Sequence, residues 1–183
     1  MLFRSLRGFT RASDRLPRDA IIGLLNDYFS IMGGAVTGAG GEILKFMGDG
    51  MLAMLPIASA DERMAVAARA TEAAVAAQRM IAALNLMRVT VEEPSVRFGL
   101  ALHVGEVMFG NIGASARLDF TVIGPAVNHA ARLEKLCSQL DRPIIVSAAL
   151  AALLPEREVV PLGRHALKDI DEPQPVYGLS ALG

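Results

Sequence analysis

The residues best suited to chemistry lie in two short segments and one loop. Asp49 stands between two glycines in GGEILKFMGDGMLAMLP, and Lys45 precedes it by four residues. In an extended strand this spacing puts the lysine and the aspartate on the same face. The two side chains could pair with each other, or they could contact a base and a metal–phosphate group. A turn aspartate without a ligand is the simpler interpretation of Gly-Asp-Gly taken alone.

A second candidate group lies in TVIGPAVNHAARLE. Asn128 and Arg132 are four residues apart, so on a helix they lie one above the other near its start. A guanidinium binds two phosphate oxygens at once, and the positive end of the helix dipole adds to the attraction for an anion. The pattern indicates an anion site, with a solvated helix face as an equally open alternative. Lys168, in ALKDIDEPQPVY, is a third candidate, although alone it is more typical of surface charge.

The elements that must position these residues follow from apolar periodicity and turn signals. In chain order we expect a strand over 1–6, a helix from 17, a hairpin around 48–50, a helix over 59–88, a strand pair over 95–110, a strand over 118–123, a helix over 126–140, a strand over 143–146, a short helix over 147–153 and strands near 157–166 and 175–180. This order of strands and helices is typical of the α+β class, with a ferredoxin-like (split βαβ) antiparallel sheet and covering helices. Helices on one face would leave the other face open to a ligand or a partner.

Local signals add detail to several of these elements. Gly33 and Gly34 weaken the end of the first helix, and Ser59 followed by Glu62 predicts a capping box on the second. The strand pair over 95–110 is expected to turn near Gly105. The methionines follow the periodicity of core positions, and the histidines are interpreted as structural because they lack metal-ligand spacing. The residues concerned are Met47, Met51, Met54, Met64, Met80, Met87, His103, His129 and His165.

Composition limits the classes of protein to be considered. A length of 183 residues predicts one domain over 1–183, and 52% hydrophobic with 20% charged residues excludes a disordered chain. A net charge of −1 offers no basic excess for nucleic acid, and the uncharged stretches are shorter than the roughly 20 residues of a spanning helix. The single cysteine, Cys137, is typical of a reducing compartment. We therefore expect a cytoplasmic domain without nucleic-acid or membrane contacts.

Taken together, these segments resemble the catalytic domain of class III nucleotide cyclases, the adenylate and guanylate cyclase family. The stretches that match in family order and spacing are FRSLRGFT, LLNDYFSIMGGAV, GGEILKFMGDGMLAMLP, LHVGEVMFGNIG, LDFTVIGPAVNHAARLE and LKDIDEPQPVYGL. The resemblance implies an adenylate cyclase, a phosphorus–oxygen lyase that converts ATP to 3′,5′-cyclic AMP and pyrophosphate. It also implies a head-to-tail homodimer or a heterodimer with another cyclase domain, with a two-ion Mg²⁺ or Mn²⁺ site in the cleft between the two copies.

The family's first metal-binding aspartate is replaced in this chain. The family pattern is F-x-D-x-x-G-F-T and this chain reads F-R-S-L-R-G-F-T, so Ser5 stands at that position, whereas Asp49 matches the second metal-binding aspartate. Mg²⁺ is bound through carboxylates and substrate phosphates, so the loss of one carboxylate is expected to weaken both metal positions. Two functions stay open: an adenylate cyclase impaired by Ser5, or a catalytically silent cyclase-like domain that binds nucleotide or pairs with another cyclase domain.

The resemblance also implies roles for the other matched residues. Lys45 matches the purine-reading lysine of adenylate cyclases, and Thr121 matches the second purine-contacting position. Asn128 matches the asparagine that orients the ribose, and Arg132 the arginine that stabilises the transition state. Lys168 matches the lysine that contacts the triphosphate. A diguanylate cyclase is disfavoured because its turn reads GG(D/E)EF, not Gly-Asp-Gly.

Overall fold

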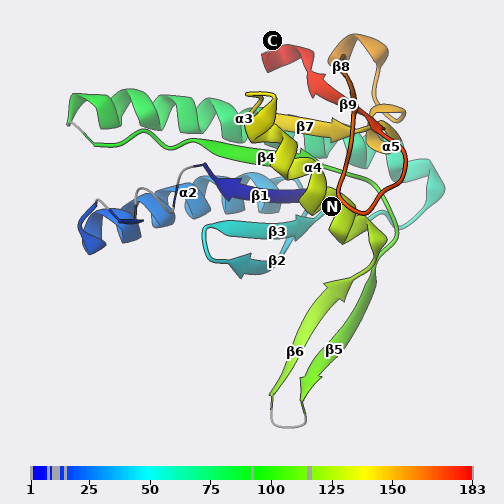
Figure 1. Cartoon of the computed structure of the whole chain (residues 1–183), viewed down its shortest axis with the longest axis horizontal. Coiled ribbons are helices and arrows are strands. Elements are labelled where there is room, and N and C mark those ends of the chain that lie inside the picture. The colour runs from blue at the N-terminus through cyan, green and yellow to red at the C-terminus, as the bar shows by residue number, and fades with distance from the viewer. Residues whose placement is uncertain are drawn as a thin grey trace.

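The computed structural model contains a main sheet, a separate two-stranded ribbon and the helices packed on the sheet (Figure 1). The residues that it describes are 2–182 except 8, 10–12, 15, 92 and 115–116, and within them the side chains of 2–5, 111–121 and 182 are left out. The strands are β1 (Leu2–Leu6), β2 (Glu42–Met47), β3 (Gly50–Met54), β4 (Phe98–Leu102), β5 (Met108–Ala114), β6 (Arg117–Ile123), β7 (Ile144–Ser147), β8 (Val159–His165) and β9 (Gln174–Leu179). The α-helices are α2 (Arg18–Gly38), α3 (Arg63–Thr90), α4 (Pro125–Gln139) and α5 (Ala148–Ala151), and the 3₁₀ turns are η1 (Ala60–Glu62), η2 (Glu156–Glu158) and η3 (Ser180–Leu182).

The main sheet has the strand order β2-β3-β1-β4-β7-β9-β8. Its first four strands, connected through α2 and α3, form the split βαβ arrangement, which confirms the expected fold class. All of its pairs are antiparallel except β4 with β7, which is parallel. The additional strands therefore extend the ferredoxin-like core on the side of β4.

Helix α4 packs on the second face of the sheet over β1, β4 and β7, so that face is not left fully open as expected. Leu100 and Leu102 of β4 belong to the core shared with α2 and α3. Ala101, which points to the opposite face, packs with Leu133 and Cys137 of α4. Successive strand residues point to opposite faces, so an apolar run such as this one supplies two cores at once.

Close contact between α4 and β4 depends on a glycine at position 99. A Cβ atom there would lie 2.7 Å from Glu134 Oε1 and 2.9 Å from Cys137 Cβ, both on α4. Burial raises the pKa of the Cys137 thiol to about 12, so the thiol is neutral and packs as a small apolar group. Because α4 carries two of the candidate site residues, this packing fixes their position relative to the sheet.

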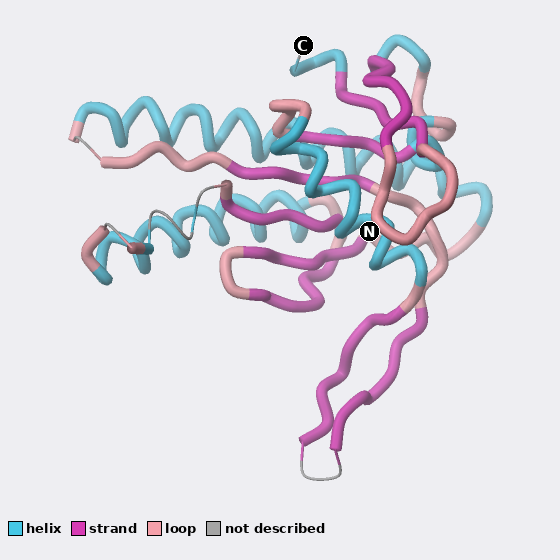
Figure 2. Tube along the Cα trace, viewed as in Figure 1, coloured by secondary structure: helices cyan, strands magenta, loops and turns pink. Residues whose placement is uncertain are grey.

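The two strands expected over 95–110 exist, but they do not pair with each other. β4 joins the main sheet beside β1, whereas β5 pairs with β6 in register from Met108 with Ile123 to Ala114 with Arg117. Figure 2 shows this ribbon extending away from the body of the domain. Residues 103–107 thus cross from the sheet to the ribbon instead of forming a tight hairpin.

Of the two local signals at helix ends, the glycines lie inside a helix that continues past them, and the expected capping box was wrong. α2 continues through Gly33 and Gly34 to Gly38, because Met32 and Val36 extend its buried stripe into the core. The capping box at Ser59 does not form. The 3₁₀ turn η1 follows Ser59 directly and precedes α3, and the Ser59 side chain makes no capping hydrogen bond. The Glu62 carboxylate instead accepts a hydrogen bond from Ala58 N at 3.3 Å.

By length and hydropathy alone, α2 is the one helix within the described ranges that could cross a membrane. A helix in a protein core can pass the same test, and α2 packs against α3, β2 and β3. Its buried residues include Leu24, Tyr28, Met32 and Val36. Part of the apolar surface of α2 is thus buried in the core.

The methionines do not all occupy core positions as expected. Met51 is fully buried and Met54 is partly buried, but four others are exposed. The exposed ones are Met47, Met64, Met80 and Met87. Helical or strand periodicity assigns a face but does not show whether that face is covered.

Candidate functional site

Asp49 lies in the turn between β2 and β3, as the Gly-Asp-Gly signal predicted. Met47 pairs with Gly50 across the hairpin, and Gly48 has a positive φ of 60°. The Asp49 carboxylate turns toward the neighbouring strand, where Oδ2 accepts a hydrogen bond from Leu6 N at 3.1 Å. In β1 the Cα of Ser5 is paired with that of Gly50. Positions 5 and 49, which are 44 residues apart in the chain, therefore lie beside each other at one end of the sheet.

Lys45 is an exposed residue of β2. The register of β2 with β3 shifts between Ile43 and Lys45, so simple alternation does not hold along this strand. Asp49 lies beyond the strand, and its carboxylate direction is set by the bond to Leu6 N. The argument that Lys45 and Asp49 share a face because of their spacing thus does not apply here.

α4 carries both Asn128 and Arg132, as predicted, but only Asn128 lies near its start, because Arg132 is the middle residue of the helix. Gly124 is the residue before the helix, and Pro125 occupies the first turn, where its missing N–H costs nothing. The Asn128 side chain is exposed. The Arg132 guanidinium is partly buried and forms an ion pair with Asp169, with 3.2 Å between Nη2 and Oδ2.

Lys168 is exposed and lies in the loop between β8 and β9, directly before Asp169. The ion pair to Asp169 therefore brings Arg132 of α4 and this loop together. Thr121 lies in β6, where it pairs with Gly110, and its side chain is outside the described part of the structure. The side chain of Ser5 is outside it as well.

The candidate residues thus form two groups. One is the pair of positions 5 and 49 at the end of β1, and the other is Arg132 with the Lys168–Asp169 turn. In Figure 1 the turn of the β2–β3 hairpin and the loop between β8 and β9 lie at different parts of the molecule. A single copy of the chain keeps its carboxylate group apart from its cationic group.

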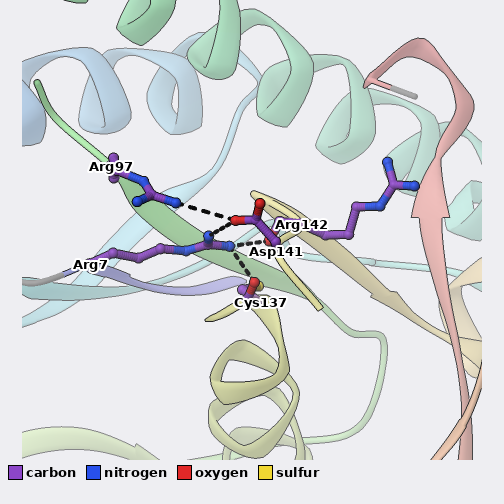
Figure 3. Close-up of polar contacts among 5 residues, drawn as sticks. All are labelled: Arg7, Arg97, Cys137, Asp141 and Arg142. Carbon is purple, nitrogen blue, oxygen red and sulfur yellow. Dashed lines mark hydrogen bonds and ion pairs between the residues drawn. The ribbon is translucent and has the colours of Figure 1, made fainter. Parts of the chain in front are cut away.

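Arg7, which directly follows β1, connects that strand to the C-terminal end of α4 (Figure 3). Its guanidinium donates to the carbonyl oxygens of Cys137 and Arg142 and pairs with Asp141 at 3.1 Å. Asp141 has a positive φ of 48°, and Arg142 N donates to Cys137 O, which together end the helix in the left-handed manner common for helices. Arg97 also contacts Asp141, at 3.2 Å. This cluster fixes α4 relative to the strand that carries position 5.

His103 and His129 form a stacked pair between β4 and α4, with ring centroids 4.5 Å apart. His103 Nδ1 and Ser147 Oγ are hydrogen-bonded at 3.0 Å, and the same Oγ accepts from Leu150 N at the start of α5. Burial, followed by the charge of His129, lowers the pKa of His103 to about 4. Burial and Arg132 lower the pKa of His129 as well. Both rings are therefore neutral at pH 7, which agrees with the expected structural role.

Acid is expected to destabilise the domain through this pair. The unfolded chain binds protons on His103 near pH 6.5, whereas the folded chain resists them until about pH 4. The stabilising contribution is thus complete above pH 6.5 and is lost as pH falls toward 4. Between pH 7 and 5, we expect Tm of the wild type to fall by roughly 3 to 6 °C more than that of His103→Asn. Thermal unfolding at several pH values measures this, with His165→Asn as the control, and parallel curves for wild type and His103→Asn would contradict it.

The roles of two residues near the site, Asp169 and Arg7, were not predicted from the sequence. Asp169 follows a candidate lysine directly, and its acidic type beside that cation was the available signal. Arg7 stands inside the motif FRSLRGFT, but nothing local indicated that it reaches the end of a helix some 130 residues later. Within the described residues no group of three or more His, Cys, Asp or Glu side chains could hold a metal ion.

The amino-acid sequence matches the family profile described as adenylate and guanylate cyclase catalytic domain over residues 1–177. It is 32% identical over 154 residues to an adenylate cyclase of Anabaena cylindrica, covering 82% of this chain and 29% of that protein. It is 29% identical over 151 residues to adenylate cyclase 1 of Rhizobium meliloti, covering 82% of this chain and 22% of that protein. The chain therefore spans less than a third of the length of either relative.

Solved structures with the same architecture carry both nucleotide specificities in their names. The crystal structure of the guanylyl cyclase Cya2 superposes with a TM-score of 0.80 at 28% identity, over 100% of this chain and 91% of that one. The adenylyl cyclase CyaB from P. aeruginosa superposes with a TM-score of 0.75 at 27% identity, over 97% and 91%. Similarity at this level does not distinguish one purine from the other.

Proposed function

The chain belongs to the adenylate and guanylate cyclase catalytic domain family, and on that premise we propose that it converts ATP to cyclic AMP and pyrophosphate between two copies. The observation that carries the proposal is the separation of two half-sites on one chain. Asp49 and position 5 form a carboxylate end, and Arg132 with the Lys168–Asp169 turn forms a cationic end. Two chains in head-to-tail contact would join the carboxylate end of each with the cationic end of the other.

Exposed apolar side chains support an interface between two copies. They lie on the β2–β3 hairpin and on the β5–β6 ribbon, which projects from the domain. The members of this set are Phe46, Met47, Met108, Phe109 and Ile123. Large exposed apolar groups gathered on projecting strands are typical of protein–protein contact surfaces.

The carboxylate end fits one metal ion better than two. Magnesium is commonly bound by one or two carboxylates together with substrate phosphates. Asp49 Oδ2 is already used by Leu6 N, and Oδ1 accepts no hydrogen bond from the described residues, so this carboxylate could hold one ion. Serine at position 5 offers a single neutral oxygen. When bound, the ion would neutralise charge on the phosphate oxygens of the nucleotide.

The cationic end supplies the contacts that a cyclisation needs. In that reaction the ribose 3′-oxygen attacks the α-phosphorus, loses its proton, and displaces pyrophosphate as the bond to the bridging oxygen breaks. Asn128 would orient the ribose, and Lys168 would bind the triphosphate. Arg132 would stabilise the charge that develops on the phosphoryl oxygens, since a guanidinium donates to two of them at once. Lys45 of β2 and Thr121 of β6, which lie outside this end, would contact the purine.

The direct test is product formation by the purified chain. ATP with Mg²⁺ or Mn²⁺ is incubated with the protein, and cyclic AMP and pyrophosphate are separated by chromatography and quantified. We expect both products in equal amounts, and more slowly with Mg²⁺ than with Mn²⁺. Absence of product from the wild type with both metals would overturn the proposal.

Lys45 is proposed to select adenine, because adenine N1 accepts a hydrogen bond whereas guanine N1 carries a hydrogen. Lysine only donates, so it matches adenine at this atom. Lys45→Ala is expected to lower kcat/KM for ATP by about 10- to 100-fold and to change that for GTP little. Lys135→Ala, at an exposed lysine of α4, is the matched control. Equal losses for ATP and GTP would contradict a role in base selection.

Ser5 favours a second candidate function, a silent cyclase-like domain that binds nucleotide and pairs with another cyclase domain. Such a chain would lend its cationic end to a partner that keeps both carboxylates. It would bind ATP, form no cyclic AMP alone, and form it when mixed with a cyclase chain whose own arginine is removed. Activity of the wild type alone would exclude this candidate.

A further inference from the structure

Asp169 forms an ion pair with the guanidinium of Arg132, the group that the proposed reaction requires. Its Oδ2 lies 3.2 Å from Nη2 of Arg132, and the two residues are 37 positions apart in the sequence. The Asp169 side chain is 64% exposed and that of Arg132 27% exposed, so the ion pair faces solvent. The arginine is therefore bound to an anion that belongs to the protein itself.

The turn that carries Asp169 is held against α4 by apolar contacts. Ile170 N donates to Leu167 O at 3.1 Å, which closes a turn with Lys168 and Asp169 at its centre. Leu167 is buried in the core that includes Leu133 of α4, and Ile170 packs against the same core. The ion pair is thus built into the fold through the anchored ends of the turn.

The backbone at Asp169 is itself unusual. Its φ is 57°, a left-handed conformation at the third residue of a turn, where glycine or asparagine is most favourable. An aspartate tolerates this conformation at some cost. A carboxylate thus stands where a neutral residue would satisfy the backbone better, directly beside the candidate triphosphate lysine, Lys168.

We propose that Asp169 is a latch on Arg132 that an incoming triphosphate must displace, and that it thereby sets the affinity of the site for nucleotide. The inference rests on the proposed function of Arg132 as a phosphate-binding group. With the latch in place, the cationic end offers the charge of Lys168 with Arg132 neutralised. Every ligand that binds through Arg132 must first break this ion pair, so the latch lowers the affinity for each such ligand by the same factor.

The latch affects binding but not the chemical step. Once the triphosphate has replaced the carboxylate, Arg132 makes the same contacts in the transition state with or without Asp169. Removing the carboxylate is therefore expected to lower KM and to leave kcat unchanged, which is the signature of a change in ground-state binding. A residue that merely held the arginine in place would instead lower kcat when removed.

The test uses Asp169→Asn, which removes the charge and keeps a residue that tolerates positive φ. The probe is 3′-deoxy-ATP with Mg²⁺, which lacks the attacking hydroxyl and is not consumed, and its affinity is measured by calorimetry. We expect about three- to tenfold tighter binding than the wild type, as for the loss of one exposed ion pair and one like charge. Asp171→Asn, which removes one charge from the same loop without a contact to Arg132, is the control.

Equal affinities for wild type and Asp169→Asn, or an equal gain from Asp171→Asn, would overturn the latch. A fall in kcat with KM unchanged would overturn it too, because that result indicates a positioning role. Absence of binding by either protein also contradicts it. If Asp169→Asn tightens nucleotide binding while no variant forms cyclic AMP, the latch stands and the proposed cyclase activity fails.

Discussion

Ser5→Asp is expected to raise the rate of cyclic AMP formation by on the order of 10- to 100-fold with Mg²⁺. Position 5 lies opposite Gly50 and next to Asp49, whose carboxylate already points to the end of β1. A second carboxylate there would complete an acidic pair able to hold the metal ions that accompany the triphosphate. We also expect the Mg²⁺ concentration for half-maximal rate to fall, because an anionic ligand binds a hard cation more tightly than a hydroxyl does.

Initial rates over a range of Mg²⁺ and Mn²⁺ concentrations measure both effects. Ser59→Asp is the matched control, since it adds the same charge at an exposed position before η1. Equal rates for wild type and Ser5→Asp would show that position 5 does not bind metal. A gain from Ser59→Asp as large as that from Ser5→Asp would attribute the effect to net charge alone.

Arg132→Ala is expected to lower kcat by about 10²- to 10³-fold, the usual loss when one stabilising donor is removed from a developing oxyanion. Asp49→Asn is expected to lower kcat by a similar factor, because it removes the carboxylate of the metal site. If each site spans two copies, a mixture of the two inactive proteins forms heterodimers with one complete site. Half of the dimers in an equal mixture are heterodimers and each has one intact site of two, so about a quarter of the activity returns.

The mixing experiment is done in the Ser5→Asp background, where turnover is faster, with cyclic AMP as the readout. Arg69→Ala, at an exposed arginine of α3, is the control for the loss of a guanidinium. Recovery on mixing requires a site shared between two chains. Two inactive variants that dimerise but recover nothing would locate the whole site within one copy and would refute the shared cleft.

Local patterns predicted the pieces that carry the candidate residues. Apolar runs around Gly48–Asp49–Gly50 predicted the hairpin, and the spacing of Asn128 and Arg132 predicted their common place on α4. These predictions succeed because a turn or a helix face depends on neighbouring residues alone. The motifs, taken in order, also identified the family, and the family implied a role for each matched residue.

The arrangement of those pieces depended on contacts that no local pattern contains. β5 follows β4 closely in the sequence, so the two strands were expected to pair with each other. In the structure β5 pairs with β6, outside the main sheet. Exposed methionines such as Met80 follow the same periodicity as buried ones, because coverage depends on which element packs above them. The capping box predicted at Ser59 does not form, because a 3₁₀ turn lies between Ser59 and α3.

By itself the sequence determined the family, the order of the elements and the replacement of an expected aspartate by Ser5. Only the tertiary structure decided that Asp49 turns to β1 and that Asp169 binds Arg132. The reason is that hydrogen bonds and ion pairs between residues tens of positions apart depend on which strands and helices become neighbours. That choice is made by the burial of both faces of the sheet, with α4 packed over Gly99, and it is a property of the whole chain.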